Sequence, residues 1–182
     1  MPAQAGNTAS SLPTNGEHTQ TLVDILVVQG KLDDKTAKSI KLSEVQSGKS
    51  QEEIIKSEKI VDEDALTNAK AALYNIPFID LNSTPISPEA LALLPQQVAA
   101  RFKVVPVSIN SLSKEMILAM SDPLDFTAIE FVEQRTGYIV KPHAATPSRI
   151  DLVLSTTYAT SLAKEVTEAL KEVSPDEGRV RT

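Results

Sequence analysis

The sequence contains no cysteine, and this absence excludes a disulfide framework and any metal site built on thiolates. Its two histidines, His18 and His143, lie far apart in the sequence, so a histidine-based zinc site is not expected either. We therefore predict no metal site in this chain. Since chains without disulfides are typical of reducing compartments, the cytosol is the default location.

Long apolar runs are also missing. No stretch approaches the roughly 20 residues that a membrane-spanning helix needs, and the N-terminus lacks the charged and then apolar profile of a signal peptide. Aromatic residues make up only 4% of the chain against 41% hydrophobic residues, so we expect an aliphatic core. The formal net charge of -6 argues against a general nucleic-acid binder.

The motifs that bind phosphates or carry out hydrolysis are absent as well. Gly48-Lys49-Ser50 has the last three letters of the phosphate-binding motif GxxxxGK[ST], but Ser43 stands where that motif needs its first glycine. The segment also follows a predicted helix instead of a strand, and we interpret it as a polar turn. No GxSxG, HExxH or GxGxxG pattern occurs. We predict no catalytic residues and no bound cofactor in this chain.

The first ordered part of the chain is predicted to be helical and internally repeated. Apolar pairs, chain reversals and helix caps recur 29 residues apart, so that Ile25 and Gly30 correspond to Ile54 and Lys59. We interpret this pattern as two tandem helix-turn-helix units that pack into a small four-helix layer.

Two details of this helical half bear on its packing and its function. Val45 on the second helix and Ala72 on the fourth are predicted to lie on apolar, buried faces. The fourth helix opens with the acidic run 62–64, and the dipole of that helix accounts for these carboxylates. Because they would repel phosphates, the helix-turn-helix pattern does not indicate DNA recognition.

The most informative stretch is residues 114–141, which reads as strand, turn, helix and strand. The unbroken apolar run 116–120 is typical of a strand buried on both faces. Asp122 and the proline after it predict the start of a helix, which ends at Gly137. A strand over 138–141 should run parallel to the first, because a helix connects the two.

The remaining elements complete a small sheet. Residues 103–109 are predicted to form a strand at the sheet edge, or one with a bulge, because Pro106 lies within it. A hairpin loop over 110–113 leads into the central strand, and Pro142 is predicted to end the last strand. A final helix, with Pro147 in its first turn, then packs back on the sheet.

Together these elements predict a mixed α+β fold, with a helical subdomain of two tandem helix-turn-helix units and a β-β-α-β-α subdomain with a three-stranded mixed sheet. The predicted boundaries are a disordered leader (1–20), the helical subdomain (21–76), a connector (77–88), the α/β subdomain (89–158), a linker helix (159–174) and a disordered tail (175–182).

The linker helix carries a narrow apolar stripe on an otherwise polar surface. A stripe this thin suits a helix that meets a partner, or a solvated helix that frays at its end, and both interpretations stay open. If a partner binds here, the candidate contact residues are Leu162, Val166, Leu170 and Val173.

Two phrases of the sequence resemble a known family. They read YNIPFIDLNSTPISPEALALLPQQVAARFKVVPV and MILAMSDPLDFTAIEFVEQRTGYIVKPHAATPSRIDLVLSTTY, and they cover residues 74–158 almost continuously. They resemble the N-terminal domain, called MshEN, of the hexameric ATPases that power type IV pilus assembly and type II secretion. The repeated helical half, residues 21–73, matches that domain more loosely.

The resemblance implies a non-catalytic docking and regulatory domain placed before an ATPase motor. Such a domain would act in the bacterial cytoplasm, peripheral to the inner membrane, by binding an inner-membrane platform protein or a cytoplasmic adaptor. Neither nucleic-acid binding nor direct membrane insertion is implied. ATP and magnesium would act in the motor, through which hexamers would form. The bare ending at residues 178–182 favours an excised domain.

Some members of this family bind cyclic di-GMP through two tandem RLGxxLxxxG motifs, and the resemblance makes such a sensor the alternative function. The two copies here read TLVDILVVQG and SQEEIIKSEK, so Thr21 and Ser50 replace the arginines, while Val23 and Glu52 replace the first glycines. Arginine would pair or stack with the ligand, and glycine would let the backbone approach it. We therefore expect cyclic di-GMP binding to be lost. The residues left as candidates for such a site are Leu22, Leu26, Gly30 and Ile55.

Overall fold

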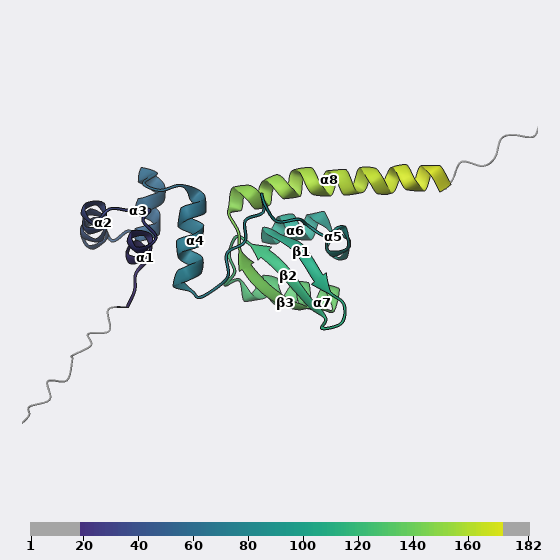
Figure 1. Cartoon of the computed structure of the whole chain (residues 1–182), viewed down its shortest axis with the longest axis horizontal. Helices are drawn as coiled ribbons and strands as arrows, with labels where there is room; N and C mark the ends of the chain where they lie inside the picture. Colours follow the sequence, from purple (N-terminus) through teal and green to yellow (C-terminus); the bar gives the residue numbers. More distant parts are fainter. Residues whose placement is uncertain (1–18, 173–182) are drawn as a thin grey trace, which may run out of the picture.

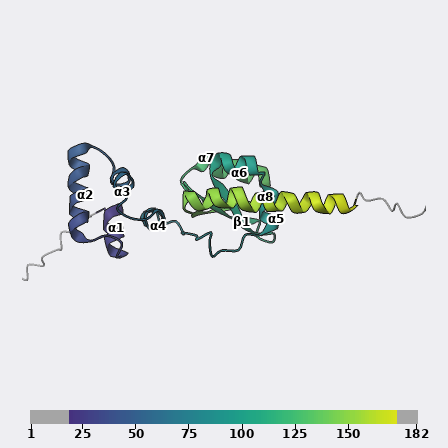
Figure 2. The same ribbon diagram turned by 90° about the horizontal axis from the view of Figure 1, so that it is seen from above.

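The computed structural model describes residues 19–172 and shows an elongated molecule, with the two ends of the described chain at opposite ends (Figures 1 and 2). Its architecture is mixed α+β, as predicted. The elements are, in chain order, α1 (Leu22–Val28), α2 (Asp34–Ser47), α3 (Gln51–Glu58), α4 (Glu63–Leu73), α5 (Pro88–Leu93), α6 (Gln96–Phe102), β1 (Val104–Asn110), β2 (Glu115–Met120), α7 (Phe126–Thr136), β3 (Ile139–Ala144) and α8 (Pro147–Glu172).

Helices α1 to α4 form the helical unit, and the first helices of its two halves share the same capping chemistry. Thr21 starts α1 and Ser50 starts α3, each in a capping box with the acidic residue three positions later. After these helices the chain reverses at Gly30 (φ 68°) and at Lys59 (φ 50°), both in the left-handed region. The repeat predicted from the sequence is therefore present at its helix starts and at its turns.

One apolar cluster holds the helical unit together, and two residues predicted to join it do not. Val45 is 83% exposed, because α2 has 14 residues and its last turn extends past the shorter helices α1 and α3. Ala72 is exposed, and its neighbour Ala71 is buried instead. The reason is that α4 stands between two partners, α1 on one side and β3 on the other (Figure 1), so its buried residues do not share a single face.

The remaining elements form the α/β unit around a three-stranded sheet. The strand order is β1-β2-β3, with β1 antiparallel and β3 parallel to the central strand β2. The register shifts between Pro106 and Ser108, so the predicted irregularity at this edge strand is confirmed. Leu118 and Met120 of β2 are fully buried. Helices α5, α6 and α8 pack against β1, and α7 packs against β3.

Strand β3 continues through Pro142 to Ala144, so the prediction that Pro142 ends it is wrong. In an edge strand, alternate N–H groups point away from the sheet, and a proline at such a position removes no ladder hydrogen bond. The neighbouring outward groups are satisfied locally. The N–H of Val140 donates to Oε1 of Glu133 at 2.9 Å, and the N–H of Ala144 donates to the carbonyl of Pro77 at 2.8 Å. These contacts leave this edge few donors for pairing with another strand.

The sequence predicted that α7 starts at Asp122 and the proline after it, but the helix begins three residues later. Asp125 is its N-cap and accepts from the N–H of Ala128 at 3.0 Å. Asp122 instead accepts from the N–H of Leu124 at 3.1 Å, which closes a tight turn before the helix. The predicted end is correct, because Gly137 terminates the helix with φ 72°.

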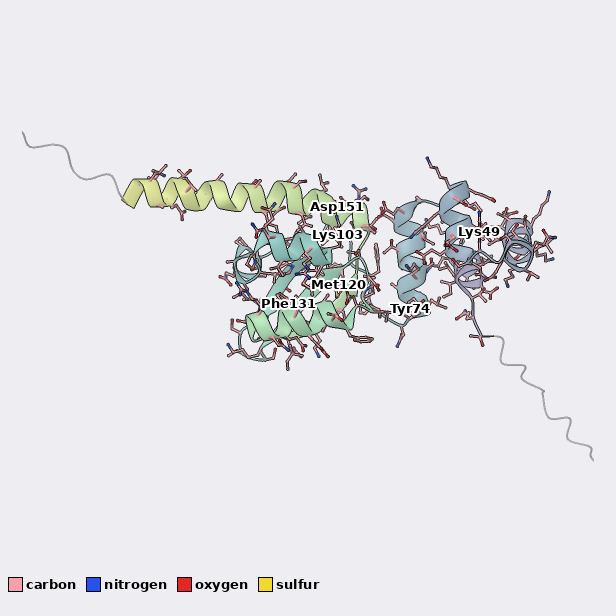
Figure 3. The ribbon with its side chains drawn as sticks, turned by 180° about the vertical axis from the view of Figure 1, so that it is seen from behind. Lys49, Tyr74, Lys103, Met120, Phe131 and Asp151 are labelled. Carbon is pink, nitrogen blue, oxygen red and sulfur yellow. The ribbon has the colours of Figure 1, made fainter. Side chains whose placement is uncertain are left out.

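Helix α8 packs on the α/β unit through its first half and projects past it through its second half (Figures 1 and 2). The packed half buries Ile150, Leu154 and Tyr158. The hydroxyl of Tyr158 donates to the carbonyl of Leu94 at 3.1 Å, and burial raises the pKa of this phenol. Near the start of α8, Asp151 forms an ion pair with Lys103, the residue before β1 (Figure 3). Among the described helices, none combines the length and the apolar composition that crossing a bilayer requires.

Candidate functional site

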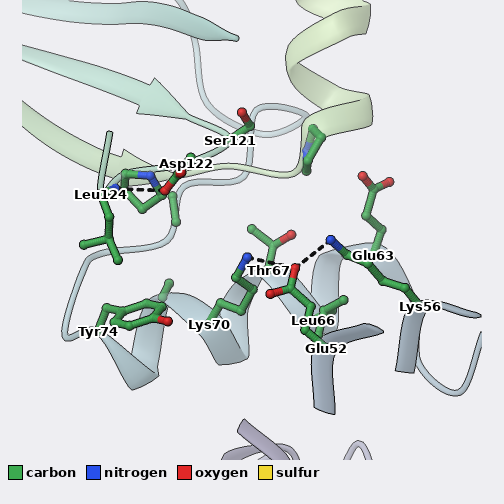
Figure 4. Close-up of a pocket in the computed structure, with 14 residues that line it drawn as sticks. Glu52, Lys56, Glu63, Leu66, Thr67, Lys70, Tyr74, Ser121, Asp122 and Leu124 are labelled. Atoms are coloured by element: carbon green, nitrogen blue, oxygen red, sulfur yellow. Dashed lines mark hydrogen bonds and ion pairs between the residues drawn. The ribbon is translucent and has the colours of Figure 1, made fainter. Parts of the chain in front are cut away.

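A cavity of about 380 Å³ lies where the helical unit meets the α/β unit (Figure 4). Helices α3 and α4 form one wall, and the turns that leave β2 and β3 form the other. Its lining residues are Glu52, Lys56, Glu63, Leu66, Thr67, Lys70, Ala71, Tyr74, Ser121, Asp122, Pro123, Leu124, Ala144 and Pro147.

One part of the cavity wall is charged. Oε1 of Glu52 lies 2.6 Å from Nζ of Lys56 and 2.9 Å from Nζ of Lys70, so one carboxylate bridges two ammonium groups from α3 and α4 (Figure 4). Partial burial alone would raise the pKa of Glu52, but the hydrogen bonds and charges of the two lysines outweigh that effect and lower it. This carboxylate is therefore held in its charged form, and it ties α3 to α4.

Another part of the wall is apolar. Tyr74 follows α4 and Leu124 precedes α7, so they come from the two units, and both side chains line the cavity (Figure 4). The two side chains are 49% and 39% exposed. The cavity therefore combines an aromatic and aliphatic part with a part that carries fixed charges. No sequence pattern predicts this pairing, because the two side chains are 50 residues apart.

Beside the cavity, carboxylates of α4 contact the start of α8. Oδ1 of Asp64 accepts from the hydroxyl of Thr146 at 2.5 Å, and Oε1 of Glu63 accepts from the N–H of Ser148 at 3.3 Å. Oδ2 of Asp64 also lies 3.9 Å from Nη2 of Arg149. From the sequence, these carboxylates were explained only by the dipole of their own helix. No sequence pattern links them to residues more than 80 positions away.

The candidate dinucleotide positions do not line this cavity. Leu22, Leu26 and Ile55 lie together in the apolar cluster of the helical unit, and Gly30 lies in the exposed turn after α1. The residues that replace the motif arginines act as helix caps. The hydroxyl of Thr21 accepts from the N–H of Asp24, and Ser50 repeats this contact at the start of α3.

Two of the candidate partner-contact residues lie on the projecting half of α8. Val166 is 57% exposed and Leu170 is also exposed. Val173 and the side chain of Leu162 fall outside the part of the chain that the structure describes. Partner contact along this stripe stays a prediction.

Potential metal ligands do not gather within residues 19–172. No group of three or more histidine, aspartate or glutamate side chains is placed to hold an ion within this part of the chain. Nδ1 of His143 lies 3.1 Å from the carbonyl oxygen of Lys141, a contact within its own strand.

Two type IV pilus assembly ATPases share sequence with this chain. PilB of Thermus thermophilus is 32% identical over 85 residues, which are 47% of this chain and 10% of that protein. PilB of Myxococcus xanthus is 30% identical over 99 residues, which are 54% of this chain and 17% of that protein. The chain thus spans less than a fifth of the length of these relatives.

A solved structure extends the likeness to the fold. A structure of MshE with cdg superimposes with a TM-score of 0.56 at 23% identity, over 74% of this chain and 96% of that chain. The N-terminal domain of XpsE gives a TM-score of 0.49 at 23% identity, over 74% of this chain and 91% of that chain.

A family model locates the likeness in the sequence. The model for the MshEN domain matches residues 74–164, which is half of the chain. The matched segment contains the whole α/β unit and the packed half of α8. On this match, and in agreement with the resemblance seen in the sequence, the chain belongs to the MshEN domain family.

Proposed function

We propose that this chain is a non-catalytic docking and regulatory domain of a type IV pilus assembly or type II secretion ATPase. The domain works in the bacterial cytoplasm and couples the motor to a protein partner at the inner membrane or in the cytoplasm. ATP and magnesium act in the motor, which also forms the hexamer. The observation that carries the proposal is the MshEN match over residues 74–164.

The shape of α8 supports a coupling role. Its first half is fixed to the α/β unit by buried side chains and by the hydrogen bond of Gln96 to the carbonyl of Leu154 at 2.8 Å. Its second half projects past that unit (Figure 1). Because a continuous helix bends little over a few turns, a partner on the projecting half would turn with the α/β unit.

A binding titration tests the docking role. The chain is titrated with the purified cytoplasmic domain of the inner-membrane platform protein, and separately with the cytoplasmic adaptors, of its own pilus or secretion machine. We expect micromolar binding to one of them, and the exposed substitution Val166→Asp should weaken it at least about tenfold, since it places a charge in the apolar stripe. The matched control is Lys164→Gln on the same helix. Absence of binding to every component at 100-fold higher concentration would overturn the proposal.

We further propose that cyclic di-GMP is not the regulator of this chain. The positions at which the motif has arginine hold Thr21 and Ser50, whose hydroxyls cap helices. Val23 is buried at the position where the glycine of the motif would let the ligand approach the backbone. Calorimetry with cyclic di-GMP should therefore show no heat of binding at micromolar concentrations. A saturable micromolar isotherm would instead establish the sensor function that the family resemblance offers as the alternative.

A further inference from the structure

The boundary between the helical unit and the α/β unit differs from the interior of either unit. Each unit has its own apolar cluster, and the two clusters share no residue within the described chain. The cavity of about 380 Å³ lies between the units, so the boundary is not closely packed. Boundaries that are small, polar and loosely packed favour movement of one unit against the other.

The covalent connection between the units is short and has an unusual backbone. Helix α4 ends at Leu73, and Asn75 then adopts φ 55°, a left-handed conformation that asparagine tolerates better than most residues. From Pro77 the chain is anchored to β3, because Ala144 donates to the carbonyl of Pro77 and Ile79 donates back to Ala144 at 2.9 Å. The N–H groups of residues 74–76 still donate to carbonyls of α4. The link between Ile76 and Pro77 is therefore the place where rotation would occur.

The polar contacts beside the cavity join two helix N-termini through one pair of carboxylates. The first backbone N–H groups of a helix lack intrahelical acceptors and carry a partial positive charge. Glu63 and Asp64 supply negative charge to the first turn of α4, and they also accept hydrogen bonds from Thr146 and from the N–H of Ser148 at the start of α8. Without these carboxylates, two positive helix ends would lie close together.

We propose that Glu63 and Asp64 form a latch that holds the helical unit closed on the α/β unit, and that its release lets the helical unit swing about the link between Ile76 and Pro77. The latch is suited to release. The side chains of Asp64 and Arg149 are 50% and 40% exposed, and an exposed ion pair shifts an equilibrium by no more than about fivefold. Moreover, Nε of Arg149 is buried and has no hydrogen-bond partner in the described chain, so the closed state does not satisfy this side chain fully.

A distance measurement between the units tests the latch directly. Because the chain has no cysteine of its own, Ser39→Cys on α2 and Ser155→Cys on α8 introduce the only two sites for spin labels, and both serines are exposed. In the unaltered background we expect one dominant distance. In E63Q/D64N, which removes both charges at nearly constant shape, we expect a second, broader population and a rise of about tenfold in the open-to-closed ratio.

A variant on the other side of the boundary keeps the test decisive if E63Q/D64N disturbs α4. T146V/R149A leaves the first turn of α4 intact and should open the molecule in the same way. The matched control D34N/E89Q removes two first-turn carboxylates from α2 and α5, and its distance distribution should not change. In the unaltered background, 1 M NaCl should also increase the open population, because it screens exposed charges.

One unchanged distance in both boundary variants and at high salt, with helix content preserved by circular dichroism, would overturn the latch. This result would leave the docking proposal untouched, because the labelled chain is measured without any partner.

Discussion

The central strand of the sheet offers the sharpest test of the fold, because two leucines near each other in sequence have opposite environments. Leu118 of β2 is 0% exposed, whereas Leu112 in the hairpin loop is 98% exposed. Replacing Leu118 by alanine removes buried methyl groups and leaves a cavity in a close-packed core. The free energy of unfolding should fall by about 2–5 kcal/mol. Leu112→Ala should change it by less than about 0.5 kcal/mol.

Aspartate at the same two positions should separate them further. Leu118→Asp loses the apolar burial and places a carboxyl group among apolar side chains that offer it no partner. The combined cost of about 5 kcal/mol or more is comparable to the whole stability of a small domain, so the α/β unit should unfold. Leu112→Asp should leave it folded.

Backbone amide spectra measure this outcome unit by unit. In Leu118→Asp, the signals of residues 88–158 should collapse to the narrow range of an unfolded chain. Signals of the helical unit should stay dispersed, because that unit has a separate apolar cluster. Dispersed α/β signals and retained protease resistance in this variant would refute the burial of Leu118. Loss of both units together would refute the independence of the two clusters.

Three further substitutions test local contacts. Glu133→Ala leaves the outward N–H of β3 without its acceptor and should lower the unfolding free energy by about 1–3 kcal/mol in urea titrations, whereas the exposed control Glu130→Ala should have little effect. A hydrogen bond from Lys41, together with two from Thr21, holds the pKa of Asp24 at about 2, below its ordinary 3.8, so these contacts contribute stability above about pH 4 that is lost as the pH falls towards 2. Asp24→Asn should make urea midpoints less pH-dependent in that range, and an unchanged slope would contradict the assignment. Lys59→Gly should add up to about 1 kcal/mol to the free energy of unfolding and raise the thermal midpoint, because glycine adopts the left-handed turn without strain. A lowered midpoint would show that the backbone of Lys59 is not strained in this turn.

Local chemistry accounts for many of the element boundaries. Ser87 followed by a proline starts α5, and Gly48 and Gly137 end α2 and α7 in the left-handed conformation. These signals work because capping and chain reversal depend on side chains and backbone angles within about four residues of each other. The start of α7 was missed because two aspartates, Asp122 and Asp125, compete within one turn, and either could cap the helix.

Other features depend on what lies beside an element. Pro142 remains within β3 because that strand is at the sheet edge, which strand order decides. Ala71 is buried in place of Ala72 because α4 contacts β3 as well as α1. An apolar periodicity read from one helix assumes a single buried face, so it fails for a helix that stands between two partners.

The sequence by itself determined the helical repeat, the strand-helix-strand segment and the family resemblance, because each rests on residue types at short, fixed spacings. Only the tertiary structure decided that Glu63 and Asp64 meet the start of α8, and that a charged and apolar cavity opens beside them. The acidic run already satisfies the dipole of its own helix, so its sequence pattern is complete without a distant partner. The second role arises from the way two units with separate apolar clusters pack, which local spacing does not encode.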